Sequence, residues 1–473
     1  MIDVPRTLGR SGGIAVGYSL APPQDAGPLW SVAVELLPVD GLDAGEMPPS
    51  ARLVGASGHS RADALLRGAG EAVERYALHP VPGLATTRGA AGALDAPALA
   101  AFEPHLALAA PAAVGAVLDW VPGRRLRDDT TVMVPAPLVD WPSLGADCAL
   151  FDPGPSGAAA GSSPRMALRS ALLEIVERDA VLGAWERGLR LPAYDDPDQV
   201  DLGPAGTAQA GSAQAGPGQA GPGQAGPGQA GPAQAGSAQV GTAQAGPAHG
   251  SPGDRRSRTA LTRLWRQARD RGITPRLARV PTAVPGLWCV IGSLVDPAGP
   301  GALATVGLKA SDRPWDALLG AFQEAWQVRA ALESSRAAGP RDEPLKTIVT
   351  EADRIHHMLT PDGYASVRDW VEGFVPAPGS PPAVDVSDED ILRAVLADGG
   401  DPVAVDLTPR LPPVLRSMGW CAVKVIPAGY QHLRMDESHG WSWNAPRLES
   451  AVARTGCEAR YPGRSAARPH PLP

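Results

Sequence analysis

GAAAGSSPRMALRSALLEIVERDAVLGAW, residues 157–185, is the stretch that decides the fold of this chain. Its second part predicts a long helix over residues 164–185, which begins after Ser162 or Ser163 with a proline just inside the first turn. The small residues before it form the kind of turn in which backbone N–H groups at a helix N-terminus can receive an anion. Such turns are common, so the side chains of the helix decide what the stretch means.

The predicted helix presents two glutamates and an arginine together, because positions i, i+3 and i+4 share one helical face. A helix predicted over residues 61–76 carries the same Glu-x-x-Glu-Arg pattern. A third, over residues 312–333, carries a glutamate and a glutamine in the i, i+3 relation, followed by an arginine. The residues concerned are Glu71, Glu74 and Arg75; Glu174, Glu177 and Arg178; and Glu324, Gln327 and Arg329.

A single helix of this kind is usually a solvated face with local salt bridges, and that alternative stays open for each copy. Apolar neighbours, such as Leu65 before the first copy and Leu172 before the second, instead predict partly buried carboxylates. Buried carboxylates need cations or hydrogen-bond donors to stay charged. Glutamates that converge from separate helices suit Mg²⁺, and arginines beside them suit phosphate. The pattern therefore indicates a Mg²⁺–nucleotide site built on helices.

The composition excludes several classes of protein. The chain has 473 residues, of which 44% are hydrophobic, with 55 Gly, 51 Pro and a net charge of −8. The hydrophobic fraction predicts a folded core, and no triplet glycine period runs through the chain, so it is not a collagen. The mild negative charge argues against nucleic acid or an anionic membrane as partner, and no apolar run is long enough to span a membrane.

Lysine and cysteine usage narrows the chemistry further. There are three lysines, Lys309, Lys346 and Lys424, and none follows the P-loop pattern, so ATP would have to be held in another way. The four cysteines are widely spaced without a C-x-x-C pair, which argues against a zinc ribbon or a dithiol redox site. The N-terminus lacks the apolar segment of a secretory signal, so we expect a cytoplasmic protein.

Strand-like and helix-like stretches alternate along the chain, which predicts an α+β (mixed α/β) fold. Further predicted strands cover residues 29–37, 284–295, 403–406 and 422–426, and a basic amphipathic helix covers 258–271. From 204 to 253 the chain repeats small residues with Gln and has almost no large apolar side chain to bury. We expect this block to be a disordered insertion, because it cannot offset its ordering entropy.

Four stretches together resemble the YcaO-domain family. They are GASGHSRADALLRGAGEAVERY (55–76), GAAAGSSPRMALRSALLEIVERDAVLGAW (157–185), DRPWDALLGAFQEAWQVRAAL (312–332) and VAVDLTPRLPPVLRSMGWCAVKVIPAGY (403–430). The final residues PHPLP (469–473) look like the terminal P-x-P-x-P of the azoline-forming members. The resemblance implies a YcaO-like catalytic domain over residues 51–473 after an N-terminal segment of residues 1–50, with a Pro-rich tail over 464–473.

The resemblance also assigns residues of this chain to roles. It implies that Glu71, Glu174, Glu177 and Glu324 hold Mg²⁺. It implies that Glu74, Arg75, Ser162, Arg178, Gln327 and Arg329 lie near ATP or its phosphates. The terminal prolines Pro469, Pro471 and Pro473 would lie near the active site. Two departures from the family pattern, Ser57 in place of a lysine and Arg67 in place of a serine, bear on the detail of the phosphate contacts.

The implied activity is ATP-dependent cyclodehydration of Cys, Ser or Thr in a ribosomally made precursor peptide, which yields azolines. The alternatives are a YcaO enzyme that forms a thioamide or an amidine, and a non-catalytic peptide-binding scaffold. A degenerate scaffold should have lost several of the five glutamates, and all are present. Because only about 50 residues precede the first motif, we expect a separate partner protein to bind the leader peptide. We also expect a homodimer.

Overall fold

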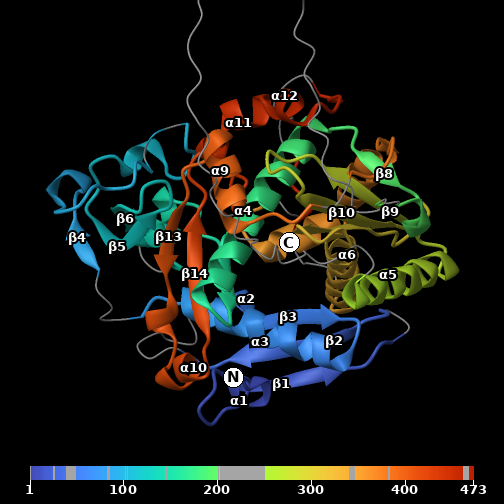
Figure 1. The fold of residues 1–473 in the computed structure, drawn as a ribbon, viewed down its shortest axis with the longest axis horizontal. Coiled ribbons are helices and arrows are strands. Elements are labelled where there is room, and N and C mark those ends of the chain that lie inside the picture. Colours follow the sequence, from blue (N-terminus) through green and yellow to red (C-terminus); the bar gives the residue numbers. More distant parts are fainter. Residues whose placement is uncertain are drawn as a thin grey trace, which may run out of the picture.

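The computed structural model describes residues 2–472 apart from 25–26, 39–48, 82–85, 102, 104, 144–145, 201, 203–250, 340–346, 382–383 and 462–467. Helices and strands are mixed along the chain (Figure 1), which confirms the predicted fold class. The repeat predicted to be a disordered insertion falls almost wholly outside the described residues, as does Pro473. Within the described part of the chain, no helix is both long and apolar enough to cross a membrane.

The first sheet is antiparallel, in the order β1-β2-β3, and a long helix, α3, covers one side of it. Its elements are β1 (Ala15–Ala21), β2 (Trp30–Leu36), β3 (Leu53–Gly58) and α3 (Arg61–Leu78). Strand β2 alternates between exposed and buried residues, with Val32, Val34 and Leu36 buried beneath α3. Residues 1–50 therefore supply two strands to the sheet that β3 completes.

The second sheet has the order β4-β5-β13-β14-β7, and β6 pairs with β5 outside that path. Its strands are β4 (Thr87–Gly89), β5 (Leu118–Arg125), β6 (Thr131–Pro135), β7 (Ala158–Gly161), β13 (Val403–Asp406) and β14 (Cys421–Ile426). β13 pairs with both β5 and β14 although about 280 residues separate it from β5. The last part of the chain thus closes a sheet that the first part began.

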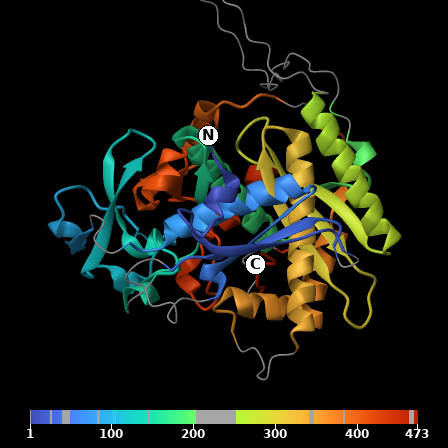
Figure 2. The ribbon, with the colours of Figure 1, turned by 90° about the horizontal axis from the view of Figure 1, so that it is seen from below.

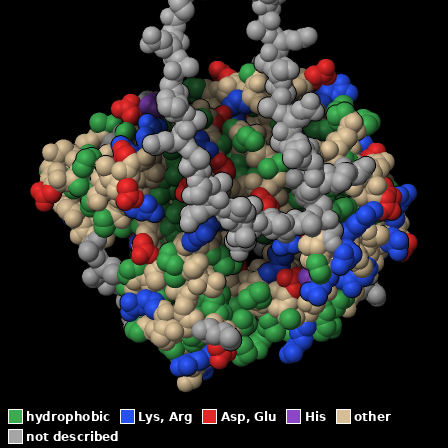
Figure 3. Space-filling view, viewed as in Figure 1, with side chains coloured by type: hydrophobic (Ala, Val, Ile, Leu, Met, Phe, Trp, Pro, Cys, Tyr) green, Lys and Arg blue, Asp and Glu red, His purple; other side chains and the backbone are tan. Residues whose placement is uncertain are grey.

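The third sheet has the order β11-β10-β9-β8-β12, antiparallel except for the β8–β12 pair. Its strands are β8 (Pro192–Tyr194), β9 (Thr274–Val280), β10 (Trp288–Val295), β11 (Ala304–Ser311) and β12 (Val375–Pro376). α6 (Pro314–Ala337) packs on β10 and β11, and α5 (Pro252–Asp270) packs on α6. The outer side of α5 is rich in exposed arginines, and basic side chains gather over it in Figure 3.

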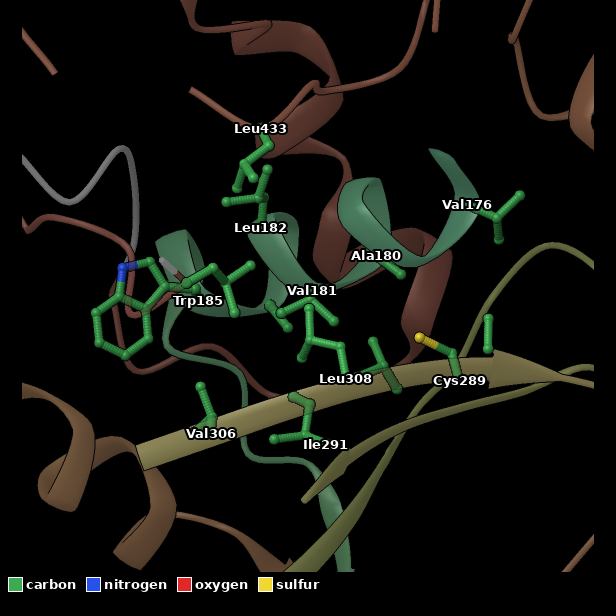
Figure 4. Close-up of a cluster of buried hydrophobic side chains, with 14 of the residues drawn as sticks. Val176, Ala180, Val181, Leu182, Trp185, Cys289, Ile291, Val306, Leu308 and Leu433 are labelled. Carbon is green, nitrogen blue, oxygen red and sulfur yellow. The ribbon is translucent and has the colours of Figure 1, made fainter. Parts of the chain in front are cut away.

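Helix α4 (Pro164–Arg187) runs between the second and third sheets (Figures 1 and 2). Fifteen of its residues are buried, because it packs against β7 and β14 on one side and against β11 on another. Figure 4 shows Val181 of α4 pointing toward Leu308 of β11 and Ile291 of β10, with Trp185 on the same side of the strands as Val181. Helix α4 therefore packs against both the second and the third sheet.

Smaller helices complete the molecule. They are α1 (Val4–Thr7), α2 (Pro49–Arg52), α7 (Glu351–Met358), α8 (Pro361–Glu372), α9 (Asp388–Ala397), α10 (Pro413–Ser417), α11 (Ala445–Glu449) and α12 (Ala451–Thr455). After α12 the chain returns to the end of α4, where the side chains of His470 and Leu472 are buried. This return brings the C-terminal tail into the core.

Candidate functional site

Three strand–turn–helix units carry the glutamates: β3–α3, β7–α4 and β11–α6. In the first unit the Ser60 hydroxyl accepts a hydrogen bond from Asp63 N at 3.2 Å. In the second, the Ser163 hydroxyl accepts one from Met166 N at 3.2 Å. Of the two serines that could begin α4, the structure selects Ser163 as the N-cap. Such caps satisfy N–H groups that a helix leaves unpaired and so hold the start of each helix.

Glycines set the distance between strand and helix in these units. A Cβ at Gly58 would lie 2.4 Å from Ala64 N, and one at Gly161 would lie 2.8 Å from Ala167 N. In the third unit, Gly307 of β11 would bring a Cβ within 2.2 Å of Ala325 N in α6. Each of these distances is shorter than a van der Waals contact, so only glycine allows the helix to approach this closely.

The close approach of α6 brings Glu324 onto β11. Its Oε2 accepts a hydrogen bond from Leu308 N at 2.7 Å. From the opposite direction, the buried Glu177 of α4 accepts one from Ala310 N of the same strand through its Oε2, at 2.5 Å. β11 therefore holds one carboxylate from each of two helices that lie far apart in the sequence.

Two of the remaining glutamates, Glu71 and Glu174, pair with the arginines of their own helices. Arg75 Nε lies 3.0 Å from Glu71 Oε1, and Arg178 Nε lies 3.6 Å from Glu174 Oε1. The Ser156 hydroxyl also donates to Glu174, at 3.4 Å. The Arg75 guanidinium lies 4.9 Å from the centre of the Trp141 ring, a distance typical of a cation–π contact.

The five glutamates form one electrostatic group. Burial, followed by the charges of Glu71 and Glu174, raises the pKa of Glu74 well above its ordinary value. Burial also raises the pKa of Glu174, and the charges of Glu177 and Glu71 add to this, while Arg178 opposes it. Carboxylates that crowd in this way need an additional cation for all of them to stay ionised.

The pKa of Glu324 is raised too, to about 7. Burial is the main cause, Arg178 opposes it, and Glu177 adds to it. Glu177 and Glu324 therefore act on each other across the gap between α4 and α6.

Among the described residues, the charges of at least four cations act on this group. Burial alone would lower the pKa of Arg75 and Arg178, but the neighbouring glutamates raise both. The third is Lys424 of β14, which is 3% exposed and donates to Gly154 O at 2.5 Å. Burial lowers its pKa to about 8 against the opposing charges of Asp140 and Glu174. The fourth is Lys309, whose charge acts on Glu324, so the five carboxylates and these four cations carry a net charge of −1 when all are ionised.

These residues fit Mg²⁺. Their ligand atoms are hard carboxylate oxygens, and they carry surplus negative charge. The buried Arg178 Nε has no hydrogen-bond partner among the described residues and could donate to a phosphate oxygen that accompanies the ion. No three of the described His, Cys, Asp and Glu side chains are arranged as a complete metal cage. Mg²⁺ does not require such a cage, because it is commonly held by one or two carboxylates together with substrate phosphates and water.

Three further predicted site residues differ in their distance from the glutamates: Gln327 lies beside them, whereas Ser162 and Arg329 do not. Gln327 donates from Nε2 to Gly55 O at 3.3 Å, which joins α6 to β3 beside the glutamates. Ser162 is exposed at the start of α4, roughly 18 Å along the helix from Glu174 by its rise per residue. Arg329 points roughly 140° around α6 from Glu324 and binds Asp296 instead. The structure does not bring Ser162 or Arg329 to the carboxylates, because α4 and α6 are long helices with several faces.

The tail predicted to reach the active site is seated at the end of α4. Pro469 is half-buried and Pro471 is buried. The Arg178 charge is close enough to the neighbouring His470 to contribute to the lowering of its pKa, after burial and Arg354. The role of Pro469 and Pro471 at the active site stays a prediction.

Sequence reasoning missed Lys424, Ser156 and Glu351. A signal for Lys424 was present, since it is a lone charge in the apolar strand Cys421–Ile426 of a lysine-poor chain. Ser156 belongs to the small-residue turn before β7 and offered no distinguishing feature. Glu351 contributes to the raised pKa of Arg75, but it lies in α7, which has no repeat of the glutamate pattern.

The chain matches a protein-family model described as YcaO cyclodehydratase, ATP- and Mg²⁺-binding, over residues 55–213 and 246–431. None of the curated proteins compared with the chain matches it.

Solved structures resemble the fold. A heterocyclase in complex with substrate and cofactor has a TM-score of 0.62 at 17% identity, covering 98% of this chain and 55% of that one. The chain thus spans about half the length of that heterocyclase. YcaO from Methanopyrus kandleri, bound with AMPPCP and Mg²⁺, has a TM-score of 0.55 at 18% identity, covering 92% and 90%. The E. coli microcin synthetase McbBCD complex has a TM-score of 0.51 at 13% identity, covering 87% of both chains.

At these identities the solved structures show a shared fold, and the family is shown by the match along the sequence. That match contains all three helices whose glutamates converge, α3, α4 and α6. The chain belongs to the YcaO family, whose members bind ATP and Mg²⁺.

Proposed function

We propose that this chain is an ATP-dependent cyclodehydratase that converts Cys, Ser or Thr residues of a ribosomally made precursor peptide to azolines. The observation that carries the proposal is the convergence of five glutamates from α3, α4 and α6 beside two arginines. Family membership confirms the expected ATP and Mg²⁺ and supports an ATP-dependent enzyme.

We assign the site residues to roles by their charge: the glutamates to Mg²⁺ and the arginines to phosphate. The glutamates that would hold Mg²⁺ on the nucleotide are Glu71, Glu174, Glu177 and Glu324. Arg75 and Arg178 would neutralise phosphate charge, and Glu74 and Gln327 would lie near the nucleotide. When bound, ATP with Mg²⁺ supplies the phosphoryl group that makes a peptide amide oxygen a leaving group.

The attacking thiol or hydroxyl would come from the peptide, so the enzyme needs no nucleophile of its own. Its cysteines agree with this. Burial raises the pKa of the Cys289 thiol well above its ordinary value, which makes it a poor nucleophile. The tail prolines Pro469 and Pro471, with Pro473 after them, would border the space where the peptide lies, and their presence favours azolines over the thioamide or amidine alternatives.

We further propose that a separate protein delivers the precursor peptide and that the enzyme is a homodimer. The McbBCD structures support the first part, since one of them is a complex with pro-MccB17 bound. Co-purification with the protein encoded beside this chain tests the partner, and light scattering tests the dimer. A monomeric mass would contradict the second part.

The decisive experiment weighs the peptide. The chain is incubated with Mg²⁺, ATP and the candidate precursor peptide encoded nearby, together with neighbouring gene products. We expect a loss of about 18 Da per ring from dehydration. A gain that corresponds to exchange of oxygen for sulfur would indicate a thioamide, and an unchanged mass under all conditions would contradict the enzyme.

A further inference from the structure

Arg354 of α7 is fully buried and binds four acceptors. Its Nη1 donates to Glu437 Oε1 at 2.7 Å and to His470 O at 3.1 Å. Its Nη2 donates to Arg434 O at 3.1 Å and to Met435 O at 3.2 Å. One guanidinium thus ties the tail to the loop that contains residues 434–437. A buried arginine is costly unless its donors are satisfied, and these contacts satisfy it.

The tail supplies acceptors that match this arrangement. Pro469 and Pro471 have no N–H, so the backbone here offers mainly carbonyl oxygens. Arg468 O accepts a hydrogen bond from Trp185 Nε1 at 3.3 Å, while His470 O accepts from Arg354. The His470 N–H faces Glu437 Oε1 at 3.4 Å, and its Nε2 lies 2.7 Å from Arg434 O. Every second residue of the tail is therefore bound to the core.

The side chains of the same alternate tail residues also contact the core. The Arg468 guanidinium stacks on the Trp185 ring at 3.8 Å, and Leu472 is 1% exposed within the core that α4 shares. The segment Arg468–Leu472 thus runs along α4, with Trp185 at its start and Arg354 at its middle.

A charge on helix α7 also acts on an arginine of the glutamate site. Glu351 lies one turn before Arg354 on the same helix face, and its charge contributes to the raised pKa of Arg75. At the other end, the Arg178 charge acts on His470. The charges of Arg75 and Arg178 thus lie within electrostatic range of α7 and of the tail, respectively.

We propose that Arg354 is the positioning residue that seats tail residues 468–472 against α4 beside the glutamate site, through its bonds to His470 O, Glu437 and the Arg434 carbonyl. Seating the tail requires only the contacts above, whereas its effect on turnover rests on the proposed function.

Tail seating can be measured without any activity. Leu472→Cys places a thiol in the buried tail, and alkylation of that thiol by iodoacetamide is followed by mass spectrometry. A double variant that also carries Arg354→Gln loses the hydrogen bonds that the two Nη atoms of Arg354 donate to the tail and to the loop of residues 434–437. We expect alkylation at position 472 to become at least about tenfold faster, since hydrogen bonds from a charged donor are lost. The native Cys289, which is fully buried in the core, reports global opening and should keep its rate.

Controls separate a local clamp from a general loss of stability. Arg393→Gln removes an exposed arginine of α9 and should leave both alkylation rates unchanged. Arg354→Lys keeps the charge without the fork and should still release the tail, although less. An unchanged rate at position 472 in both Arg354 variants would overturn the proposal, and so would an equal acceleration at Cys289.

Turnover provides the link to function. We expect Arg354→Gln to lower kcat with the precursor peptide by about tenfold while KM for ATP stays within about twofold, because only positioning is lost. In a chain that lacks residues 468–473, the same substitution should have no further effect on kcat. Additive effects would overturn the positioning role. Absence of peptide turnover in the unaltered chain would contradict the proposed function and leave the alkylation result standing.

Discussion

At the scale of the residue, Glu177 shows how one side chain can join two elements. It is 6% exposed on α4 and accepts a hydrogen bond from Ala310 N of β11. Its charge also acts on Glu324 and Arg178. A buried carboxylate with one backbone donor and a like-charged neighbour is a position at which a cation is needed.

We predict that Glu177→Gln lowers Mg²⁺-dependent ATP hydrolysis by at least about a hundredfold, because it removes charge where charge must be stabilised. Gln keeps an acceptor for Ala310 N, so the unfolding temperature should change little. Glu389→Gln, at an exposed site on α9, is the matched control. Full hydrolysis in the Glu177 variant would remove Glu177 from the metal site.

Asp152 makes stability depend on pH. It is buried and accepts hydrogen bonds from Met435 N at 3.0 Å and Asp436 N at 3.1 Å. Burial raises its pKa to about 7 despite these donors. The folded chain therefore binds this proton more tightly than the unfolded chain. Its contribution to stability is present below the ordinary pKa of 3.8 and is lost as pH rises through about 7.

We predict that Asp152→Asn makes the free energy of unfolding depend less on pH. From pH 4 to pH 8, the free energy of unfolding in urea should fall further for the unaltered chain than for the variant. Asp270→Asn, at the exposed end of α5, should leave the slope unchanged. A constant difference between the Asp152 variant and the unaltered chain across this range would contradict the shifted pKa.

At the scale of the element, the contact between α6 and β11 positions Glu324. Gly292 and Gly307 are directly opposite each other in β10 and β11. A Cβ on either would meet backbone atoms of α6 within 2.8 Å. The pair forms a flat surface on which the helix lies.

We predict that Gly307→Ala pushes α6 away, destabilises the chain by about 1–3 kcal/mol and weakens Mg²⁺-dependent ATP binding. Urea unfolding and isothermal calorimetry measure the two effects. Gly299→Ala lies in the loop between the same strands, where an added Cβ meets nothing within 4 Å, and should be close to neutral. If both variants behave alike, the glycine does not set the helix position.

At the scale of the whole molecule, the site joins three sheets. α3 covers the first sheet, α6 covers the third, and α4 lies between the second and the third. A ligand held by glutamates from all three helices would therefore stabilise the molecule as a unit.

We predict that ATP with Mg²⁺ raises the unfolding temperature, with a stabilisation of about 2.7 kcal/mol at a ligand concentration one hundred times Kd. Scanning calorimetry measures the shift. Chelation of Mg²⁺ should abolish most of it, and Glu177→Gln should reduce it. An equal shift with and without Mg²⁺ would contradict metal-dependent binding by the glutamates.

Local patterns predicted the elements well. The strand predicted over 403–406 is β13, and the helices predicted from 61 and 164 begin at Arg61 and Pro164. The basic helix predicted from 258 begins at Pro252 instead. The block predicted to be disordered ran to residue 253, but its last two residues belong to α5, because Ser251 forms a capping box with Asp254 just before them. The strand predicted from 284 begins at Trp288, because Pro285 and the left-handed Gly286 form a turn before it.

The sequence by itself determined which helices carry the glutamates, since i, i+3 and i+4 spacing, serine caps and apolar faces act within a few turns of chain. It also determined the family. Only the tertiary structure decided that Lys424 joins the site, that Arg329 turns to Asp296, and that Arg354 binds the tail. These outcomes depend on long-range strand pairing and on glycine contacts between strand and helix. No local spacing encodes them, because the partners lie far beyond a helical turn: Arg329 and Asp296 are 33 positions apart, and Arg354 and His470 are 116 positions apart.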